Sequence, residues 1–343
     1  MNRTEKKFLE TVRTRDLAGK NDRVLIAVSG GPDSMALLHL FHAAMPVLHI
    51  RIGVAHCNFR LRGAESDSDE SFVRAACEEL GVDCFVKGFD TQDLSVLWKK
   101  SIEETARILR YGFFSELLRE QRFSRVATGH HVNDNAETIL FNLFRGTSVP
   151  ALKGIRTRHG SIVRPLLLFH KKEILDYLLE KGIAYRTDSS NLCIDHDRNF
   201  IRNRVIPLIE ERFKSKLMPS LQRMSEHAAE LEEFLELHFD NLVASRPGLS
   251  PDGGSIDIRE LHALTLFERK EILKRALREF DAKVDARVLQ RLVDLLERQS
   301  GRSVPLSSAL LVVRDGDLLR FVVRGAGSAG EGDRVIPEVN SGS

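Results

Sequence analysis

The sequence predicts an α/β fold, with a parallel sheet in the N-terminal part and a smaller, mainly helical C-terminal domain. Three observations lead to this prediction. Short runs rich in β-branched residues alternate with helical patterns through the first half of the chain, a glycine turn follows the first of these runs, and helical patterns dominate from Arg164 onward. Strands separated by helices are typical of βαβ crossovers, which bury a parallel sheet between two helical layers.

The predicted elements of the N-terminal part follow one another in regular order after a first helix near the N-terminus. Strands are predicted at 24–28, 49–55, 84–88, 125–128 and 162–163. Helices are predicted between them at 33–43, 67–80, 102–118 and 133–144. In a parallel sheet of this kind a ligand binds at the carboxyl ends of the strands, so functional residues are expected in the loops that follow them.

The C-terminal part is predicted to be mainly helical, with one hairpin. Helices are expected at 170–181, 199–212, 215–242, 266–280 and 286–298, and hairpin strands at 309–313 and 318–323. The helix at 215–242 carries apolar residues at three-four spacing, which is typical of a core-facing stripe. We expect residues 1–214 to form the α/β domain, 215–324 the helical domain, and 325–343, rich in Gly, Ser and charge, a disordered tail.

The composition is that of an ordinary globular protein, with 42% hydrophobic and 29% charged residues. The formal charge of +2 over 343 residues points to no particular class of partner. No apolar run approaches the ~20 residues that span a membrane. The N-terminal residues lack the apolar segment of a signal peptide, so we expect a cytoplasmic protein without a membrane partner. The four cysteines form no C-x-x-C pair, which predicts reduced thiols without a metal or redox role.

The most specific motif of the chain follows the first predicted strand. It consists of Ser29, Gly30, Gly31, Pro32, Asp33 and Ser34. A strand that turns through two glycines into a helix leaves free backbone N–H groups at the positive end of the helix dipole, which favours phosphate binding. The string is not a Walker loop, because no Gly-Lys-Ser/Thr follows. A carboxylate at Asp33 beside phosphate indicates a divalent cation between them. The alternative is a glycine turn in which Asp33 caps a core helix.

Two further strand ends carry polar clusters. The second strand leads into His56 and Arg62, which can meet phosphates, although a solvated loop would look the same. After the fourth strand, Asp134 and Glu137 fall on one face of a first helical turn. These carboxylates can hold a metal ion or an ammonium group. The alternative is that Asn133 or Asp134 is the N-cap residue and Glu137 completes a capping box. His130 and its neighbouring histidine lack the i, i+4 spacing of a helical zinc pair.

Two pairs of arginines share helix faces. Arg107 and Arg110 are three positions apart and can clamp a phosphate bidentately, or they can belong to a salt-bridged, solvated helix. Arg198 and Arg202 lie one turn apart on the helix predicted at 199–212 or at its start. This second arrangement suits a nucleic-acid backbone or a triphosphate.

Taken together, these motifs resemble those of the PP-loop ATP pyrophosphatases, and specifically those of the tRNA(Ile)-lysidine synthases. The resemblance covers residues 24–207 and implies a Rossmann-like PP-loop ATPase domain. It rests on Ser-Gly-Gly-Pro-Asp-Ser at 29–34, Val-Ala-His to Leu-Arg-Gly at 54–63, Ala-Arg to Arg-Tyr at 106–111, Gly-His-His to Glu-Thr at 129–138 and Arg-Asn-Phe-Ile-Arg at 198–202. The chain departs from the family pattern at Phe59, Asn133 and Asn135, so we assign no role to these positions.

The resemblance also implies a reaction. ATP, L-lysine and the isoleucine tRNA with anticodon CAU would give lysidine at the wobble cytidine through an adenylated cytidine, with release of AMP and pyrophosphate. The expected cofactors are ATP and Mg²⁺, with Asp33 as the magnesium ligand. The expected partners are tRNA(Ile) and free lysine, and a homodimer is a further expectation.

Roles for individual residues follow from the same resemblance. Catalytic residues are expected at Asp33, Arg107, Arg110, Asp134 and Glu137. Nucleotide-binding residues are expected at Ser29, Gly30, Gly31, Pro32, Asp33, Ser34, His56 and Arg62. Substrate-binding residues are expected at His130, Asp134, Glu137, Arg198, Asn199 and Arg202. Recognition of the tRNA outside its anticodon is expected of the helical domain.

Three other functions fit parts of the pattern. A PP-loop tRNA thiolase would use the same adenylation to deliver sulfur, but such enzymes need paired cysteines, and the spacing here provides none. A small-molecule amide ligase is disfavoured by the basic cluster at 198–204. A non-catalytic RNA-binding protein with a vestigial loop is disfavoured because the carboxylates of the motifs are intact.

Overall fold

The computed structural model describes residues 1–186, 197–280, 282 and 284–323. The chain divides into two compact units, Met1–Glu230 and Leu231–Ser343. The tail predicted at 325–343 lies outside the described residues. No helix in the described ranges has the length and apolar character needed to cross a membrane.

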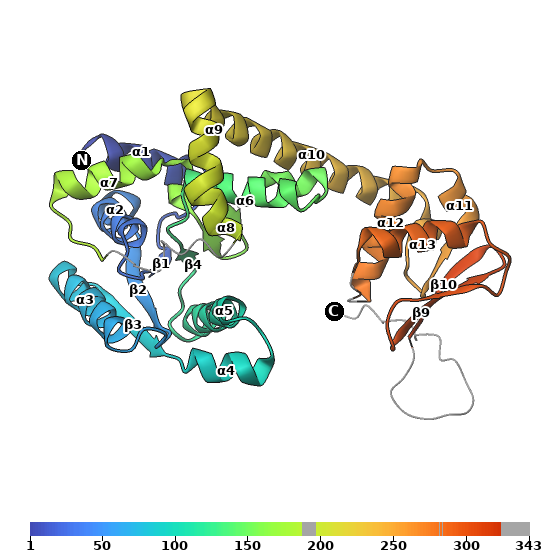
Figure 1. Ribbon diagram of the computed structural model, residues 1–343, viewed down its shortest axis with the longest axis horizontal. Helices are drawn as coiled ribbons and strands as arrows, with labels where there is room; N and C mark the ends of the chain where they lie inside the picture. Colours follow the sequence, from blue (N-terminus) through green and yellow to red (C-terminus); the bar gives the residue numbers. More distant parts are fainter. Residues whose placement is uncertain (187–196, 281, 283, 324–343) are drawn as a thin grey trace. The chain divides into compact units, whose positions relative to one another are not determined.

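The first unit is built around a sheet with helices on both faces (Figure 1). Its strands are β1 (Arg23–Ala27), β2 (Arg51–Asn58), β3 (Asp83–Gly88), β4 (Arg125–Ala127), β5 (Arg158–His159) and β6 (Ile162–Val163). Its helices are α1 (Arg3–Thr14), α2 (Pro32–Leu48), α3 (Ala64–Leu80), α4 (Thr91–Trp98), α5 (Ile102–Glu120), α6 (Val132–Phe144), α7 (Lys171–Lys181), α8 (Asp197–Phe200) and α9 (Ile206–Phe213). Within the described residues, this sheet has six strands in the order β3-β2-β1-β4-β6-β5. All neighbours are parallel except β5 and β6.

Alternating side chains of β1 explain why both faces of the sheet are covered. Val24 and Ile26 pack into the core formed with α1, α2, α3 and α7. Leu25, between them in sequence, points to the opposite core, where Phe113 and Phe114 of α5 lie. A strand buried on both faces is expected in a parallel sheet, and the unbroken apolar run of β1 is its sequence signature.

The strand order places a topological switch at β1. The chain runs outward from β1 to β2 and β3 on one side, and returns to β4 and β6 on the other. Ala27 pairs with Ala55 of β2, and Ile26 pairs with Ala127 of β4. The loops that follow β1, β2 and β4 therefore meet at one edge of the sheet, where ligands bind in open α/β folds.

The second unit combines helices with a small sheet. Its elements are the end of α10 (Leu217–Ser245), β7 (Ser255–Asp257), α11 (Ile258–His262), α12 (Leu266–Glu279), α13 (Ala286–Leu296), β8 (Ser303–Pro305), β9 (Leu310–Asp315) and β10 (Leu318–Val323). The strands form an antiparallel sheet in the order β7-β10-β9-β8. The predicted hairpin is confirmed as β9 and β10. The two short strands that flank it carry too few residues to show an alternating pattern, and the sequence did not predict them.

Most predicted helices differ from the observed ones by a few residues at their ends, and two differ more. The helix predicted at 199–212 is divided, because a π-helical stretch, η4 (Ile201–Val205), separates α8 from α9. Pro207 explains the division, since its ring lacks an N–H donor and clashes with the carbonyl group one turn earlier. The helix predicted at 33–43 continues to Leu48, past Pro46.

Candidate functional site

The glycine turn after β1 forms a loop that is held by internal hydrogen bonds and leads directly into α2. Gly30 has a φ of +92°, which residues with a Cβ rarely adopt. The Ser34 hydroxyl group donates a hydrogen bond to the Gly31 carbonyl (2.9 Å) and accepts one from the Ser29 amide (3.2 Å). Gly31 is the N-cap residue of α2 and provides no side-chain cap, while Pro32 occupies the first turn. The helix therefore presents uncapped backbone N–H groups to an incoming anion.

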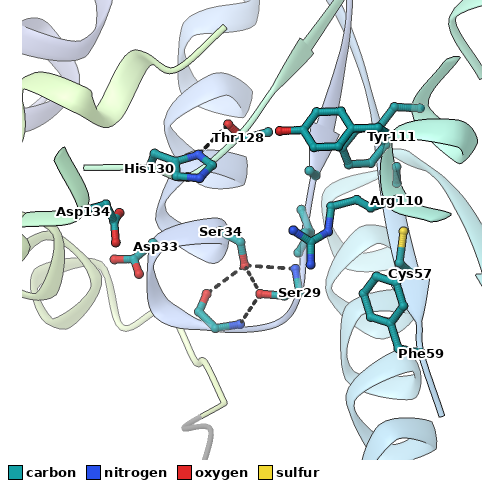
Figure 2. A pocket seen from close by; sticks show the side chains of 16 residues that line it. Ser29, Asp33, Ser34, Cys57, Phe59, Arg110, Tyr111, Thr128, His130 and Asp134 are labelled. Atoms are coloured by element: carbon teal, nitrogen blue, oxygen red, sulfur yellow. Dashed lines mark hydrogen bonds between the residues drawn. The ribbon is translucent and has the colours of Figure 1, made fainter. Parts of the chain in front are cut away.

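A pocket of about 290 Å³ lies beside this loop, at the carboxyl ends of β1, β2 and β4 (Figure 2). Its apolar lining residues are Ala27, Val28, Ala55, Cys57, Phe59 and Phe114. Its polar lining residues are Ser29, Asp33, Ser34, Arg110, Tyr111, Thr128, His130 and Asp134, with Gly31 and Gly129 between them. An apolar wall next to an anion-binding turn suits a nucleotide, which has an apolar base and charged phosphates.

Asp33 faces the pocket and is paired with a lysine that sequence reasoning missed. Lys171 Nζ lies 2.6 Å from Asp33 Oδ1, and Lys171 is the first residue of α7. The Lys171 amide also donates to the side-chain oxygen of Asn133 (3.3 Å), which ties the start of α7 to α6. The pair joins residues 138 positions apart. No local pattern around this lysine could have indicated the contact, because it depends on how α2 and α7 pack.

Asp134 closes the N-terminus of α6 and also faces the pocket. His131 is the N-cap residue, and its amide donates to Asp134 Oδ2 (2.9 Å). The Asn133 amide donates to His131 Nδ1 (3.2 Å), which completes a capping box. The segment is thus a capped helix start, as the alternative interpretation predicted, but the N-cap residue is His131. Glu137 has no part in the box.

Asp134 and Glu137 are brought together by Arg202. Its guanidinium group donates two hydrogen bonds to Glu137 (2.6 and 2.9 Å) and one to Asp134 (3.1 Å). Burial raises the pKa of the Glu137 carboxyl group, and the contact with Arg202 opposes that rise. The Glu137 contact also raises the pKa of Arg202. Arg202 lies on η4, so the π-helical distortion positions the side chain that bridges the two carboxylates.

Arg110 and Arg107 lie on α5, each over an aromatic ring. The Arg110 guanidinium group is 5.3 Å from the centre of the Phe59 ring, and that of Arg107 is 5.1 Å from the centre of the Tyr111 ring. Arg110 lines the pocket, whereas Arg107 does not. His130 lines it too, and burial lowers the pKa of its imidazole to about 4, with nearby positive charges assisting. His130 is therefore neutral at physiological pH, and its Nδ1 lies 2.9 Å from the Thr128 hydroxyl group.

Nine predicted site residues lie outside the pocket lining: Gly30, Pro32, Arg107, Glu137 and Arg202, described above, and His56, Arg62, Arg198 and Asn199. His56 is buried, and its Nδ1 atom lies 2.9 Å from the Val28 carbonyl oxygen, so it braces the strand before the loop. Arg62 is paired with Asp69 (2.7 Å) at the start of α3. Arg198 lies over the ring of Phe141 at 5.5 Å, and Asn199 follows it on α8. The structure thus places these residues around the site rather than within it.

Asp33 is the carboxylate of the pocket that could hold a magnesium ion shared with phosphate. The described residues hold no group of three or more His, Cys, Asp or Glu side chains arranged around a metal position. Asp33 and Asp134, however, both lie 3.6 Å from the His131 ring, on opposite nitrogens. Mg²⁺ is commonly bound by one or two carboxylates together with substrate phosphates and water, so Asp33, beside the phosphate-binding turn, could serve as such a ligand.

The fold and the pocket define an ATP-binding protein of the PP-loop class. The family model described as "PP-loop domain" matches residues 1–209, which include the glycine turn and all pocket-lining residues. The U34-tRNA thiolase NcsA from Methanococcus maripaludis has a similar fold, with a TM-score of 0.54 and 20% sequence identity. The similar region covers 66% of this chain and 78% of that one.

Two relatives define the particular family. The tRNA(Ile)-lysidine synthase of Chlorobaculum tepidum is 60% identical over 321 residues, which are 94% of this chain and 97% of that one. The tRNA(Ile)-lysidine synthase of Clostridium perfringens is 32% identical over 92% of this chain and 68% of its own length. The chain belongs to the tRNA(Ile)-lysidine synthase family.

Proposed function

We propose that this protein ligates L-lysine to C2 of the wobble cytidine of tRNA(Ile) with a CAU anticodon, using ATP and releasing AMP and pyrophosphate. The observation that carries the proposal is the pocket in which the glycine loop, Asp33 and Asp134 meet at the sheet edge. The high identity to the Chlorobaculum tepidum enzyme, over nearly the whole of both chains, supports the same activity.

In the first step, the C2 carbonyl oxygen of cytidine attacks the α-phosphorus of ATP. A bond forms between that oxygen and phosphorus, and pyrophosphate leaves in line. The loop amides around Gly30 and Gly31 and the Ser34 hydroxyl group hold the departing phosphates. Lys171 is close enough to Asp33 to contribute a positive charge at the same end of the pocket. Arg110 stabilises charge on the α-phosphoryl oxygens.

The divalent cation belongs to this first step. Asp33 would hold Mg²⁺, which when bound would neutralise negative charge on the triphosphate. The Lys171 ammonium group holds Asp33 Oδ1 in the described structure, so the lysine and the nucleotide-bound ion would share this carboxylate.

In the second step, the ε-amine of lysine attacks C2, and AMP leaves with the oxygen. The amine must be neutral, yet its pKa lies about 3 units above neutral pH. A carboxylate must therefore receive a proton from the incoming ammonium group. Asp134 is the first candidate, because it lines the pocket, and Glu137 is the second. Arg202 orients both carboxylates toward one another.

The RNA must present its wobble base out of the anticodon stack to reach the pocket. Arg198, Asn199 and Arg202 are proposed to position the nucleic acid near the carboxylates. Residues 215–324 are proposed to distinguish tRNA(Ile) from methionine tRNAs, which share the CAU anticodon. A cytoplasmic location and a homodimer complete the proposal.

The test is a reaction with ATP, radiolabelled lysine and unmodified tRNA(Ile). We expect label in the RNA and one pyrophosphate released per lysine incorporated, with no label in methionine tRNA. Asp134→Asn should keep pyrophosphate release and slow lysine transfer, because an amide can cap α6 but takes up no proton. Asp176→Asn, at an exposed pair on α7, is the matched control. Pyrophosphate release without lysine incorporation by the unmodified enzyme would overturn the proposal.

A further inference from the structure

Three arginines gather around Tyr111 without a carboxylate partner. Arg107 and Arg110 come from α5, and Arg164 follows β6. Among the described residues, none of the three forms an ion pair with an Asp or Glu side chain, in contrast to Arg60, Arg62, Arg74, Arg119 and Arg158 of the same unit. Clustered like charges repel, so such a group is expected where an anion arrives from outside the chain.

Arg164 shows the strongest sign of a missing partner. One of its terminal nitrogens donates to the Arg156 carbonyl (2.8 Å), but its Nε is buried and has no hydrogen-bond partner. Burial lowers the pKa of Arg164, the Tyr111 hydroxyl group beside it raises that pKa, and the charge of Arg107 lowers it again. Arg107 therefore lies over the Tyr111 ring and Arg164 lies near the Tyr111 hydroxyl group, close enough for the two charges to interact.

We propose that Arg107 and Arg164, which both neighbour Tyr111, bind the RNA phosphodiester group next to the target cytidine. The inference rests on the proposed function, since it assigns a partner to the same site. Neither arginine lines the nucleotide pocket. The triphosphate end of that pocket already has the loop amides, Ser34 and Lys171, so these two cations are left for a second anion.

The surroundings favour RNA over the carboxylate of free lysine. Arg107 is exposed at the surface of α5, which suits a macromolecular ligand better than an enclosed small one. Tyr111 carries the Arg107 guanidinium group on its ring, and Phe59 next to it carries that of Arg110. Aromatic rings interleaved with arginines are typical of sites for unstacked, single-stranded RNA.

The experiment measures binding of unmodified tRNA(Ile) without ATP, as a function of salt. Each phosphate contact in single-stranded RNA contributes about 0.7 to the slope of log K against log salt concentration. Because the two arginines share one phosphodiester group, the double substitution Arg107→Gln with Arg164→Gln should reduce the slope by ~0.7, and Arg107→Gln alone should reduce it by a measurable part of that amount. Arg119→Gln removes an equal charge from the far end of α5, where Arg119 pairs with Glu120, and should leave the slope unchanged. ATP affinity should stay within a factor of about two in all variants.

A lysine substitution at Arg107 distinguishes an RNA phosphodiester group from the carboxylate of free lysine as the bound anion. Arg107→Lys should restore the slope, because a phosphodiester accepts a point charge, whereas bidentate recognition of a carboxylate would not be restored. The exposed position of Arg107 keeps the test valid even if Arg164→Gln fails to fold. An unchanged slope in Arg107→Gln, or a raised KM for lysine or ATP in its place, would overturn the inference. Wild-type enzyme that binds tRNA but forms no lysidine would contradict the proposed function and leave this inference standing.

Discussion

At the residue scale, the pKa values of the buried titratable side chains of the site depend on their burial and on their charged neighbours. Glu137 is 4% exposed; burial raises the pKa of its carboxyl group, and two hydrogen bonds from Arg202 oppose that rise. His130 stays neutral because burial and two arginines oppose its protonation. Removing one partner of such a pair leaves the other charge buried, which costs more than the pair contributes when intact.

Replacing Arg202 with Gln should therefore destabilise the protein in a pH-dependent way. The loss of the cation would raise the pKa of Glu137 further, so the folded state would bind a proton that the unfolded state releases. Between the unfolded and folded pKa values, stability then falls as pH rises. We expect a loss of about 2 kcal/mol at pH 8 and less at pH 5. Thermal unfolding of the wild type and the variant across this pH range measures the loss of stability. An equal loss at both pH values would contradict the role of Arg202 in lowering the pKa of Glu137.

Sequence alone could identify which residues carry charge here, but not which of them meet. Asp33, Asp134 and Glu137 stand in motifs at strand ends, where topology makes them neighbours. Lys171 and Arg202 approach them from 138 and 65 positions away. Those contacts depend on helix packing and on the π-helical turn, which no local spacing predicts.

At the element scale, the proposed phosphate site lies in the strand–loop–helix unit of β1 and α2. A Cβ added at Gly30 would lie within van der Waals distance of Phe72 and Val73, and the Arg186 amide donates to the Gly30 carbonyl (2.9 Å). The loop was predictable because glycine, proline and serine there each meet a local need of the turn. The division of the helix predicted at 199–212 was not predicted, although Pro207 was the signal for it.

Gly30→Ala should distort this loop while leaving the fold intact. A Cβ at a φ of +92° is strained whatever the space around it. We expect ATP affinity to fall by at least about tenfold, which corresponds to ~1.4 kcal/mol. The control is Gly112→Ala on α5, where the added Cβ meets nothing within 4 Å and a helix is favoured by alanine. Calorimetric titration with ATP compares the two; equal affinity in both variants would argue against the loop as the phosphate site.

At the scale of the whole molecule, one helix belongs to both compact units. Leu221 of α10 packs in the core with α6, and Phe239 of the same helix packs in the core of the second unit. The units divide after Glu230, within α10. The domain boundary expected at residue 214 stays a prediction. An amphipathic stripe shows that a helix packs against a core, but it does not show which domain that core belongs to. The antiparallel sheet of the second unit was predicted only through its hairpin, the part with the clearest turn.

The central claim is that the PP-loop pocket transfers AMP to an RNA base before lysine arrives. The direct measurement is a single-turnover reaction with α-³²P-labelled ATP and unmodified tRNA(Ile), first without lysine. We expect label that stays with the RNA and is released as AMP when lysine is added. With Asp33→Asn, we expect no label on the RNA. Label appearing only as ADP, or lysidine formed without any RNA-borne adenylate, would contradict it.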